Sequence, residues 1–317
     1  MPTADDHSFA LVLNDVFKRH DTGHGHPERP ARYDAVSSGV NRADALDHAV
    51  RIEAQLASLE HIALCHGEDY IEMARRDIES GLPQLSTGDT DVSLASFEVA
   101  RLAVGSVIAT VDAVLNGSAQ TAFCALRPPG HHARPNQGMG FCVFNNIAIG
   151  ARYAQQQYGI ERVLIADWDV HHGNGTQDIF YDDPSVFFFS THQSPWYPGT
   201  GARSETGSGA AVGTNMNRPF PAGSGREQVL GAFRDDLVPA ARAFQPDLVM
   251  ISAGFDSRIG DPLGNFTLDD DDFVELTEIM RDLADTTAQG RVISLLEGGY
   301  DLEGLAAAVE AHVGALL

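Results

Sequence analysis

A short stretch near the middle of the chain, residues 167–175, combines carboxylates, imidazoles and glycines in the order Asp-Trp-Asp-Val-His-His-Gly-Asn-Gly. Asp169 and His171 are two residues apart, a spacing at which a strand end presents both side chains on one side. A third carboxylate, Asp256, stands in a similar setting further on. Two carboxylates and an imidazole suit Zn²⁺, and also Fe²⁺ or Co²⁺. Three protein ligands with one open position are typical of a catalytic zinc site.

Two adjacent histidines, His131 and His132, follow a stiff Pro-Pro-Gly turn and are candidates for the acid and base that amide hydrolysis needs. Neighbouring imidazoles need different partners if they are to hold different protonation states. Asp167 and Asn174 could be these partners. An aspartate raises the pKa of a neighbouring histidine, whereas an asparagine leaves the histidine more nearly neutral. Tyr300, after two glycines, could donate to the oxyanion of a tetrahedral intermediate.

Apolar runs rich in β-branched and aromatic residues must position these side chains, and they alternate with amphipathic segments. The predicted strands are Phe9–Leu13, Thr121–Leu126, Arg162–Ala166, Val186–Ser190, Leu248–Ser252 and Val292–Leu296. The predicted helices are Asp69–Ser80, Ser96–Asn116, Asn145–Tyr158, Arg226–Phe244, Asp269–Ala288 and Leu302–Val313. Runs that are apolar at consecutive positions are typical of strands buried on both faces of a parallel sheet. The alternation therefore predicts a doubly wound α/β fold.

The candidate residues follow the carboxyl ends of four predicted strands. These strands precede the histidine pair, the 167–175 motif, Asp256 and the Gly-Gly-Tyr turn, respectively. Open α/β sheets bind their ligands in the crevice beyond the carboxyl ends of the strands. We therefore expect all of these side chains to meet at one rim of the sheet.

Length and charge narrow the class of protein further. The 317 residues are 43% apolar and contain no linker or repeat, which predicts one domain over residues 1–317. No apolar run approaches the ~20 residues of a membrane helix, and Met1–His7 lacks the apolar core of a secretory signal, so we expect a cytoplasmic protein without membrane partners. A net charge of −23 argues against nucleic acid as a partner.

Two smaller features of the sequence indicate no further site. The three cysteines, Cys65, Cys124 and Cys142, are an odd number without metal-binding spacing, so we expect small buried side chains rather than disulfides. The loop 20–29 holds three histidines, but a glycine- and proline-rich loop lacks the surrounding groups that orient metal ligands.

Six motifs that occur in order carry a resemblance to a known family. They are PPGHH at 128–132, GFCVFNN at 140–146, DWDVHHGNG at 167–175, PGTG at 198–201, SAGFDSRIGDP at 252–262 and EGGY at 297–300. With these motifs, the chain from about Leu11 to Val313 resembles the zinc-dependent histone deacetylases, including the bacterial acetylpolyamine amidohydrolases. The resemblance implies a single arginase-like α/β domain around an eight-stranded, mostly parallel sheet with helices on both faces. In carrying Asn174 and the Gly140-Phe141-Cys142 segment, the chain is more similar to the class II-like branch of that family.

The resemblance also implies a role for each motif residue. One zinc ion per chain would be held by Asp169, His171 and Asp256. The catalytic groups would be His132 as base and then acid, His131 as its electrostatic partner, Asp167, Asn174 and Tyr300. Asp167 and Ser190 would help to hold a structural K⁺. Substrate would contact Gly140, Phe141, Tyr197, Leu263 and Gly298, with Phe141 and Tyr197 as the aromatic walls of a narrow tunnel. Arg29 would lie near an internal cavity for the released acid.

The implied activity is hydrolysis of a linear amide, most simply removal of acetyl groups from N-acetyl-lysine-type substrates, small or peptidic. Polyamine-preferring relatives tend to place an acidic residue at the tunnel mouth, where this chain has Leu263. Asp89 or Asp91 could supply the carboxylate instead, so acetylpolyamine or other small-amide hydrolysis stays open. A non-catalytic acyl-amine binder is the alternative of another class, and a homo-oligomer is possible. A binuclear arginase-type site is disfavoured, because Gly173 stands where a further ligand would be needed.

Overall fold

Eight parallel strands form one twisted sheet in the computed structural model, which describes residues 8–317. Their spatial order is β2-β1-β3-β8-β7-β4-β5-β6, and every pairing in the described sheet is parallel. The strands are β1 (Phe9–Val12), β2 (Ala49–Arg51), β3 (Thr121–Cys124), β4 (Val163–Asp167), β5 (Val186–Gln193), β6 (Asn215–Phe220), β7 (Leu248–Ala253) and β8 (Val292–Leu296). The expected α/β class and eight-stranded sheet are confirmed, whereas the prediction about Met1–His7 lies outside the described residues.

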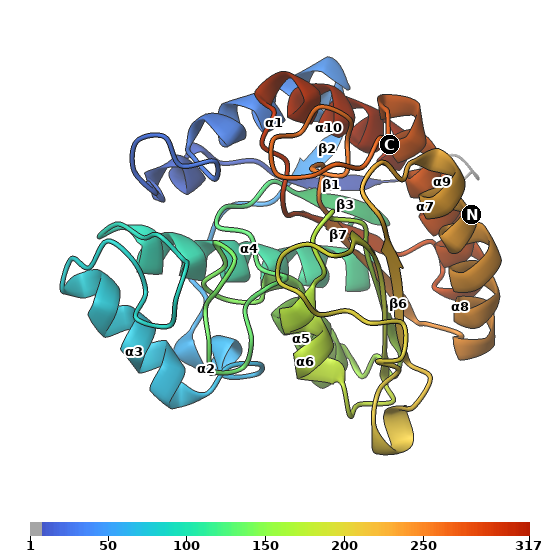
Figure 1. The fold of residues 1–317 in the computed structure, drawn as a ribbon, viewed down its shortest axis with the longest axis horizontal. Coiled ribbons are helices and arrows are strands. Elements are labelled where there is room, and N and C mark those ends of the chain that lie inside the picture. Colours follow the sequence, from blue (N-terminus) through green and yellow to red (C-terminus); the bar gives the residue numbers. More distant parts are fainter. Residues whose placement is uncertain (1–7) are drawn as a thin grey trace.

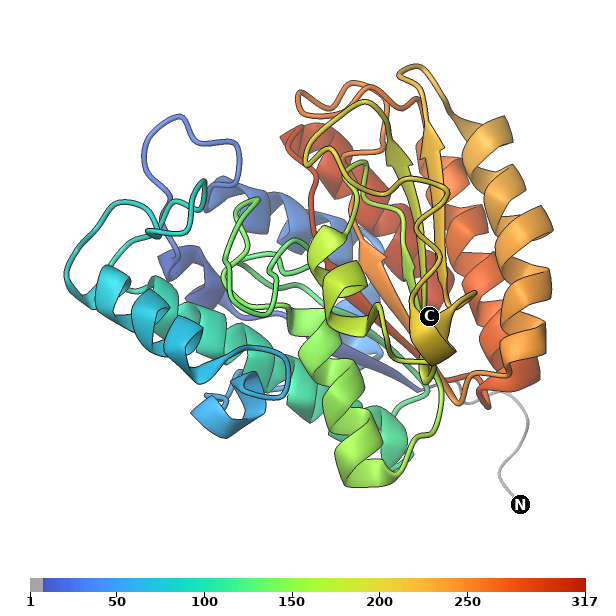
Figure 2. The ribbon, with the colours of Figure 1, turned by 60° about the horizontal axis from the view of Figure 1, so that its bottom comes forward.

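Helices cover both faces of this sheet (Figures 1 and 2). Helices α1, α9 and α10 pack together on one face, and α4 packs with α5 on the other. The α-helices are α1 (Ala31–Arg42), α2 (Leu59–Ile62), α3 (Glu68–Glu79), α4 (Ser96–Leu115), α5 (Asn146–Tyr158), α6 (Asn174–Phe180), α7 (Arg226–Gly231), α8 (Val238–Phe244), α9 (Asp270–Thr287) and α10 (Leu302–Leu316). Coverage on both faces explains the fully apolar strands, since every residue of β4 and β7 is buried.

All six predicted strands and all six predicted helical segments are present, with ends shifted by a few residues. The predicted helix at 226–244 consists of α7, a π-helical turn over Ala232–Leu237 and α8. Strands β2 and β6 were not predicted, because the first has three residues and the second is polar. Both lie at sheet edges, where Pro219 in β6 is tolerated since an edge strand has no partner on one side.

The register of the sheet brings the chemically important strand ends together. Asp167, the last residue of β4, pairs with Ser190 on β5 and with Ser252 on β7. On the side away from β4, strand β7 pairs with β8, and β8 in turn pairs with β3. The loops that follow β3, β4, β7 and β8 therefore leave the same edge of the sheet. Among residues 8–317, no helix is both long and apolar enough to span a membrane.

Candidate active site

The three predicted metal ligands converge at the ends of β4 and β7. Their ligand atoms lie within 4.8 Å of one another, and all three residues are buried. His171 Nδ1 is 3.0 Å from Asp169 Oδ1 and 3.2 Å from Asp256 Oδ2. Ligand atoms on a tetrahedral zinc ion at ~2.0–2.2 Å would be roughly 3.3–3.6 Å apart, so these separations are close to those required.

The surroundings of the carboxylates also fit a metal ion. Asp256 Oδ1 accepts a hydrogen bond from the Val170 N–H at 2.8 Å. Asp256 Oδ2 is buried and, apart from the 3.2 Å approach of His171 Nδ1, has no hydrogen-bond partner within residues 8–317. A buried carboxylate oxygen without a donor is costly, and a cation would compensate for it. The donor set and this oxygen together fit Zn²⁺ at Asp169, His171 and Asp256.

The two histidines after the Pro-Pro-Gly turn have the different partners that their proposed roles require. His131 Nδ1 is 2.9 Å from Asp167 Oδ2, and His132 Nδ1 is 2.7 Å from Asn174 Oδ1. Burial lowers the pKa of His131, but the nearby carboxylates of Asp167 and Asp169 outweigh it and raise the pKa well above the ordinary value. Burial and the adjacent His131 lower the pKa of His132 well below it. At neutral pH one ring is therefore cationic and the other neutral.

Backbone hydrogen bonds fix the turn after β8 that carries Tyr300. Its N–H donates to Asp261 Oδ2 at 2.6 Å, and the Asp301 N–H donates to the same oxygen at 3.2 Å. Asp261 Oδ1 accepts from the Leu263 N–H at 2.8 Å, so one carboxylate ties the Gly-Gly-Tyr turn to the loop after β7. Burial raises the pKa of the Tyr300 phenol well above its ordinary value, which keeps the hydroxyl protonated as a donor.

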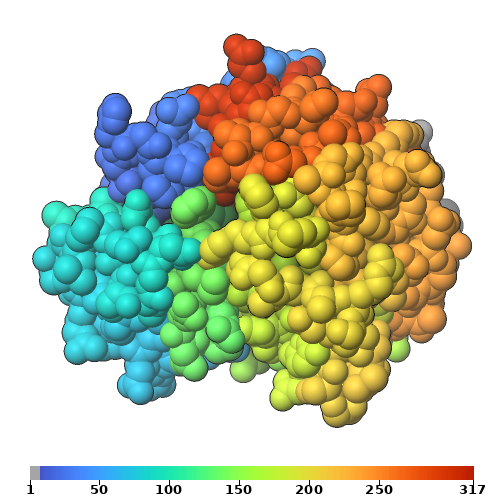
Figure 3. Space-filling model, viewed as in Figure 1, coloured from blue at the N-terminus to red at the C-terminus, as the bar shows by residue number. Residues whose placement is uncertain are grey.

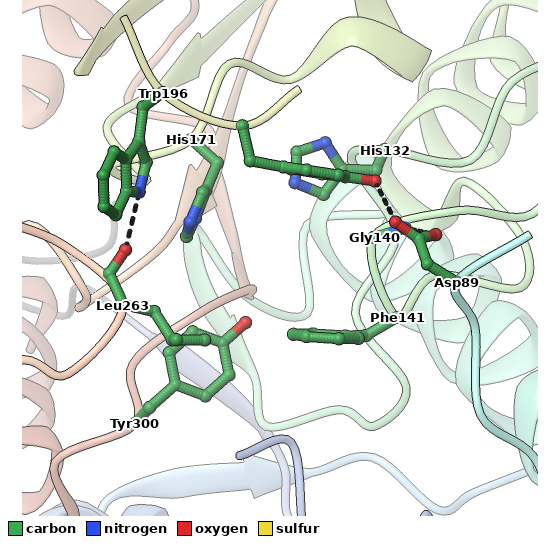
Figure 4. Close-up of a pocket in the computed structure, with 9 residues that line it drawn as sticks. Asp89, His132, Gly140, Phe141, His171, Trp196, Leu263 and Tyr300 are labelled. Atoms are coloured by element: carbon green, nitrogen blue, oxygen red, sulfur yellow. Dashed lines mark hydrogen bonds between the residues drawn. The ribbon is translucent and has the colours of Figure 1, made fainter. Parts of the chain in front are cut away.

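A cavity of about 240 Å³ opens onto these groups. Its lining residues are Asp89, His132, Gly140, Phe141, His171, Trp196, Tyr197, Leu263 and Tyr300. Phe141 and Tyr300 face each other across the cavity (Figure 4) and meet edge to face at 6.1 Å. The Tyr197 ring lies 5.2 Å from that of His132. The space-filling view shows that segments far apart in the sequence, coloured cyan, green, yellow and orange, meet on this face (Figure 3). Most of the exposed lining of the cavity is apolar, which suits an aliphatic group.

The sequence prediction placed two residues differently from the structure. Gly298 was expected to contact substrate, but it is not among the residues that line the cavity. Its N–H donates to Asp169 Oδ2 at 2.8 Å, so it supports the metal ligands from behind. Arg29 was expected at an internal cavity, but its side chain is exposed. The buried arginine is Arg32, three residues later and the second residue of α1.

Several residues around the site were not anticipated. Arg32 donates to the carbonyl oxygens of Gly299 at 2.5 Å and Glu297 at 2.6 Å, and its guanidinium lies 4.9 Å from the Tyr300 ring. Glu28 accepts from both Arg32 and Arg127. A charged residue within an apolar stretch would have indicated a buried ionic group. Glu28 lies in a polar loop, so its sequence setting gave no such indication.

The positions proposed for a monovalent cation are adjacent in the sheet. Asp167 and Ser190 are register partners on β4 and β5, and both are fully buried. Asp167 Oδ1 accepts from the Asp169 N–H at 3.1 Å, and Ser190 Oγ is 2.9 Å from His192 Nδ1. The three cysteines are buried and free, as predicted.

Comparisons with known proteins agree with this geometry. The histone deacetylase domain family matches residues 26–316. "Histone deacetylase 10, chloroplastic" of Oryza sativa subsp. japonica is 41% identical over 300 residues, covering 90% of this chain and 68% of that protein. Human "Polyamine deacetylase HDAC10" is 40% identical, covering 92% of this chain and 44% of that protein. The crystal structure of the HDA15 HD domain superposes with a TM-score of 0.92 at 34% identity, covering 98% of this chain and 88% of that one.

Proposed function

The chain belongs to the histone deacetylase family and is a deacetylase, and we propose that it hydrolyses N-acetyl-lysine-type amides with the help of one zinc ion. The observation that carries this proposal is the cavity itself. One narrow space presents the candidate metal ligand His171, the neutral His132 and the Tyr300 hydroxyl to the same small volume.

The proton transfers are assigned to His132. A zinc ion held by Asp169, His171 and Asp256 would polarise the acyl carbonyl and acidify a water molecule beside it. The Nδ1–H of His132 donates to Asn174, which leaves Nε2 as the basic nitrogen toward the cavity. His132 then removes a proton from the attacking water and returns it to the leaving amine. The cationic His131 lies 4.0 Å away, ring to ring, and opposes a second positive charge on His132 until that transfer occurs.

Tyr300 stabilises the negative charge that develops on the acyl oxygen. Its phenol is protonated, and the hydrogen bond from its backbone N–H to Asp261 fixes the turn that carries it, so little reorganisation is needed when the charge appears. We also propose that Asp167 and Ser190 hold K⁺ below the histidine pair, which their adjacent positions on β4 and β5 support.

The apolar wall of the cavity favours a substrate with an uncharged stem. Leu263 occupies the position at which we expected an acidic residue in polyamine-preferring enzymes. Trp196 Nε1–H donates to the Leu263 carbonyl at 2.8 Å, which fixes this wall (Figure 4). Acetylpolyamine hydrolysis is the second candidate, because Asp89 lines the same cavity and human HDAC10 bears the name of a polyamine deacetylase.

A substrate panel tests this assignment. Zinc-loaded protein should cleave an acetyl-lysine peptide with a higher kcat/KM than acetylputrescine or acetylspermidine. His132→Ala and Tyr300→Phe should each reduce the rate by about 10² or more, since each removes a group that acts in the transition state. Full activity in His132→Ala would reject the assigned base, and a polyamine preference above a hundredfold would reverse the order of the two substrates. Binding of acetyl-lysine without any turnover would instead indicate a non-catalytic binder.

A further inference from the structure

One wall of the cavity is a surface segment between two fixed ends. Residues 194–200 follow β5 and carry Trp196 and Tyr197, both of which line the cavity. Most of the segment is exposed, so packing alone does little to fix it. Its middle is tied by Trp196 to the Leu263 carbonyl (Figure 4) and by Tyr197 to Asp89. The position of this wall therefore depends on a few polar contacts, there and at the two ends.

The first end of the segment is fixed by Gln193, the last residue of β5. Its N–H donates to the Val170 carbonyl at 2.8 Å, and its Oε1 accepts from the Asn265 N–H at 2.9 Å. Both partners belong to loops that also carry candidate metal ligands. This end is therefore tied directly to the active edge of the sheet.

The second end is fixed by side chains that the proposed mechanism does not use. The Gly201 carbonyl accepts from His192 Nε2–H at 3.0 Å, and the Gly201 N–H donates to Glu205 Oε2 at 3.2 Å. Thr200 Oγ1 lies 2.8 Å from Nδ1 of His172, the second histidine of the 167–175 motif. A Cβ atom at Gly201 would collide with both imidazole rings, so only bare backbone fits between them.

Glu205 connects this second end to α6. The same oxygen, Oε2, also accepts from Gln177 Nε2 at 2.7 Å. Gln177 is buried on α6, and its Oε1 accepts from the Asn217 amide on β6 at 2.7 Å. Helix α6 begins at Asn174, which contacts His132. One carboxylate oxygen thus joins the wall segment to the helix that also holds the partner of the base.

We propose that Glu205, which does not line the cavity, is a positioning residue that holds the wall formed by residues 194–200 in place for substrate. This inference rests on the proposed amide hydrolysis and adds a residue outside the cavity that controls binding. Without Glu205 Oε2, the Gly201 N–H and the Gln177 amide both lose their acceptor, and substrate must order the wall at a cost in affinity. The reacting groups keep their own contacts, so binding is affected rather than chemistry.

Glu205→Ala tests the proposal because it removes the acceptor without touching the cavity. The KM for an acetyl-lysine peptide should rise about fivefold, on the scale of one lost hydrogen bond, while kcat changes by less than about twofold. Trp196 provides a second readout that needs no turnover. It is 40% exposed, whereas Trp168, the other tryptophan of the chain, is fully buried. The variant should show stronger acrylamide quenching and a red-shifted emission.

Glu205→Gln is the matched control, because an amide oxygen in the place of Oε2 can accept from the same two donors without a charge. Its KM and quenching should stay within about twofold of the wild-type values. Thr200→Val is a second variant, at an exposed position where folding is not at risk. Loss of the hydroxyl beside His172 should shift both readouts in the same direction as Glu205→Ala.

Three outcomes would overturn the proposal. Unchanged KM and quenching in Glu205→Ala would show that the wall is held without this carboxylate. Equal losses in the alanine and glutamine variants would assign the effect to charge. A fall in kcat together with a lower urea unfolding midpoint would indicate a general structural role. If the wild-type protein did not hydrolyse the peptide, the proposed function would fail, whereas the quenching comparison would still decide whether Glu205 holds the wall.

Discussion

At the scale of single residues, the different protonation states of the two histidines depend on whether the side chain behind each ring is a carboxylate or an amide. The carboxylate of Asp167 lies behind His131, and the amide of Asn174 lies behind His132, at nearly equal distances. The charged partner favours the imidazolium form of His131, and the uncharged partner does not oppose the effect of burial on His132. A neutral base beside a cationic neighbour follows directly from this pair of side chains.

Asn174→Asp should therefore change the pH dependence of the reaction. A negative charge behind His132 stabilises its protonated form and raises its pKa, so the neutral base exists only at higher pH. We expect the acidic limb of the kcat/KM profile to move upward by about one pH unit. An acidic limb at the same pH in both proteins would show that another group controls it.

At the scale of elements, the turn after β8 holds the metal ligands in place from below. The Gly298 N–H donates to Asp169, and a Cβ atom at this position would collide with Asp256 Oδ2 and lie 2.6 Å from Asp169 Oδ2. Strands β4, β7 and β8 thus meet at one backbone position that has no room for a side chain. The requirement for glycine here is steric.

Gly298→Ala should weaken zinc binding, because the added methyl group displaces both carboxylates from the positions they share with His171. We expect at least a tenfold increase in the Kd for zinc, within the range that follows from disturbing groups behind metal ligands. Competition with a chromophoric chelator measures it. Gly314→Ala in α10 is the control, since a Cβ atom there has no neighbour within 4 Å. Equal zinc affinity in the two variants would contradict the steric argument.

At the scale of the whole molecule, a buried ionic cluster joins three distant segments. Glu28 accepts from Arg127 at 2.5 and 2.6 Å and from Arg32 at 3.1 Å. Arg32 in turn holds the carbonyls of Glu297 and Gly299 on either side of the β8 turn. The N-terminal loop, the loop after β3 and the turn before Tyr300 are therefore coupled through one carboxylate.

Glu28→Gln should destabilise the fold by ~3–5 kcal/mol, because it leaves two buried guanidinium groups without their counter-charge. Burial raises the pKa of Glu28, but Arg127 and His20 lower it well below the ordinary value. A lowered folded-state pKa stabilises the protein above the unfolded pKa of about 4.3, and this contribution is lost as the pH falls through the folded value. Urea unfolding of wild type and variant at pH 7 and at low pH measures both effects.

Glu98→Gln is the control for that measurement, since Glu98 pairs with Arg19 at the exposed surface. It should leave the unfolding midpoint nearly unchanged. If Glu28→Gln were as mild as Glu98→Gln, the buried cluster would not contribute to stability. The difference between the two variants should also narrow at low pH, because protonation removes the Glu28 charge from the wild-type protein.

The sequence alone determined the fold class and most of the chemistry. Consecutive apolar residues in six runs specified buried parallel strands, and the polar residues after them specified the active edge, because carboxyl ends of parallel strands share one side. The metal ligands and both histidines are local in sequence to those strand ends, so their types and spacing were sufficient to identify them.

Only the tertiary structure decided which residues surround that edge. Arg32 and Glu28 lie in a helix and a loop far from the motifs, and their spacing in the chain carries no record of the contacts they make. The sequence left open whether Asp89 or Asp91 reaches the cavity, and the structure places Asp89 in its lining. Gly298 shows the same limit, since its position beside a motif tyrosine did not reveal that it faces the carboxylates. Contacts between segments that are distant in sequence depend on how helices and loops pack over the sheet, which local patterns do not encode.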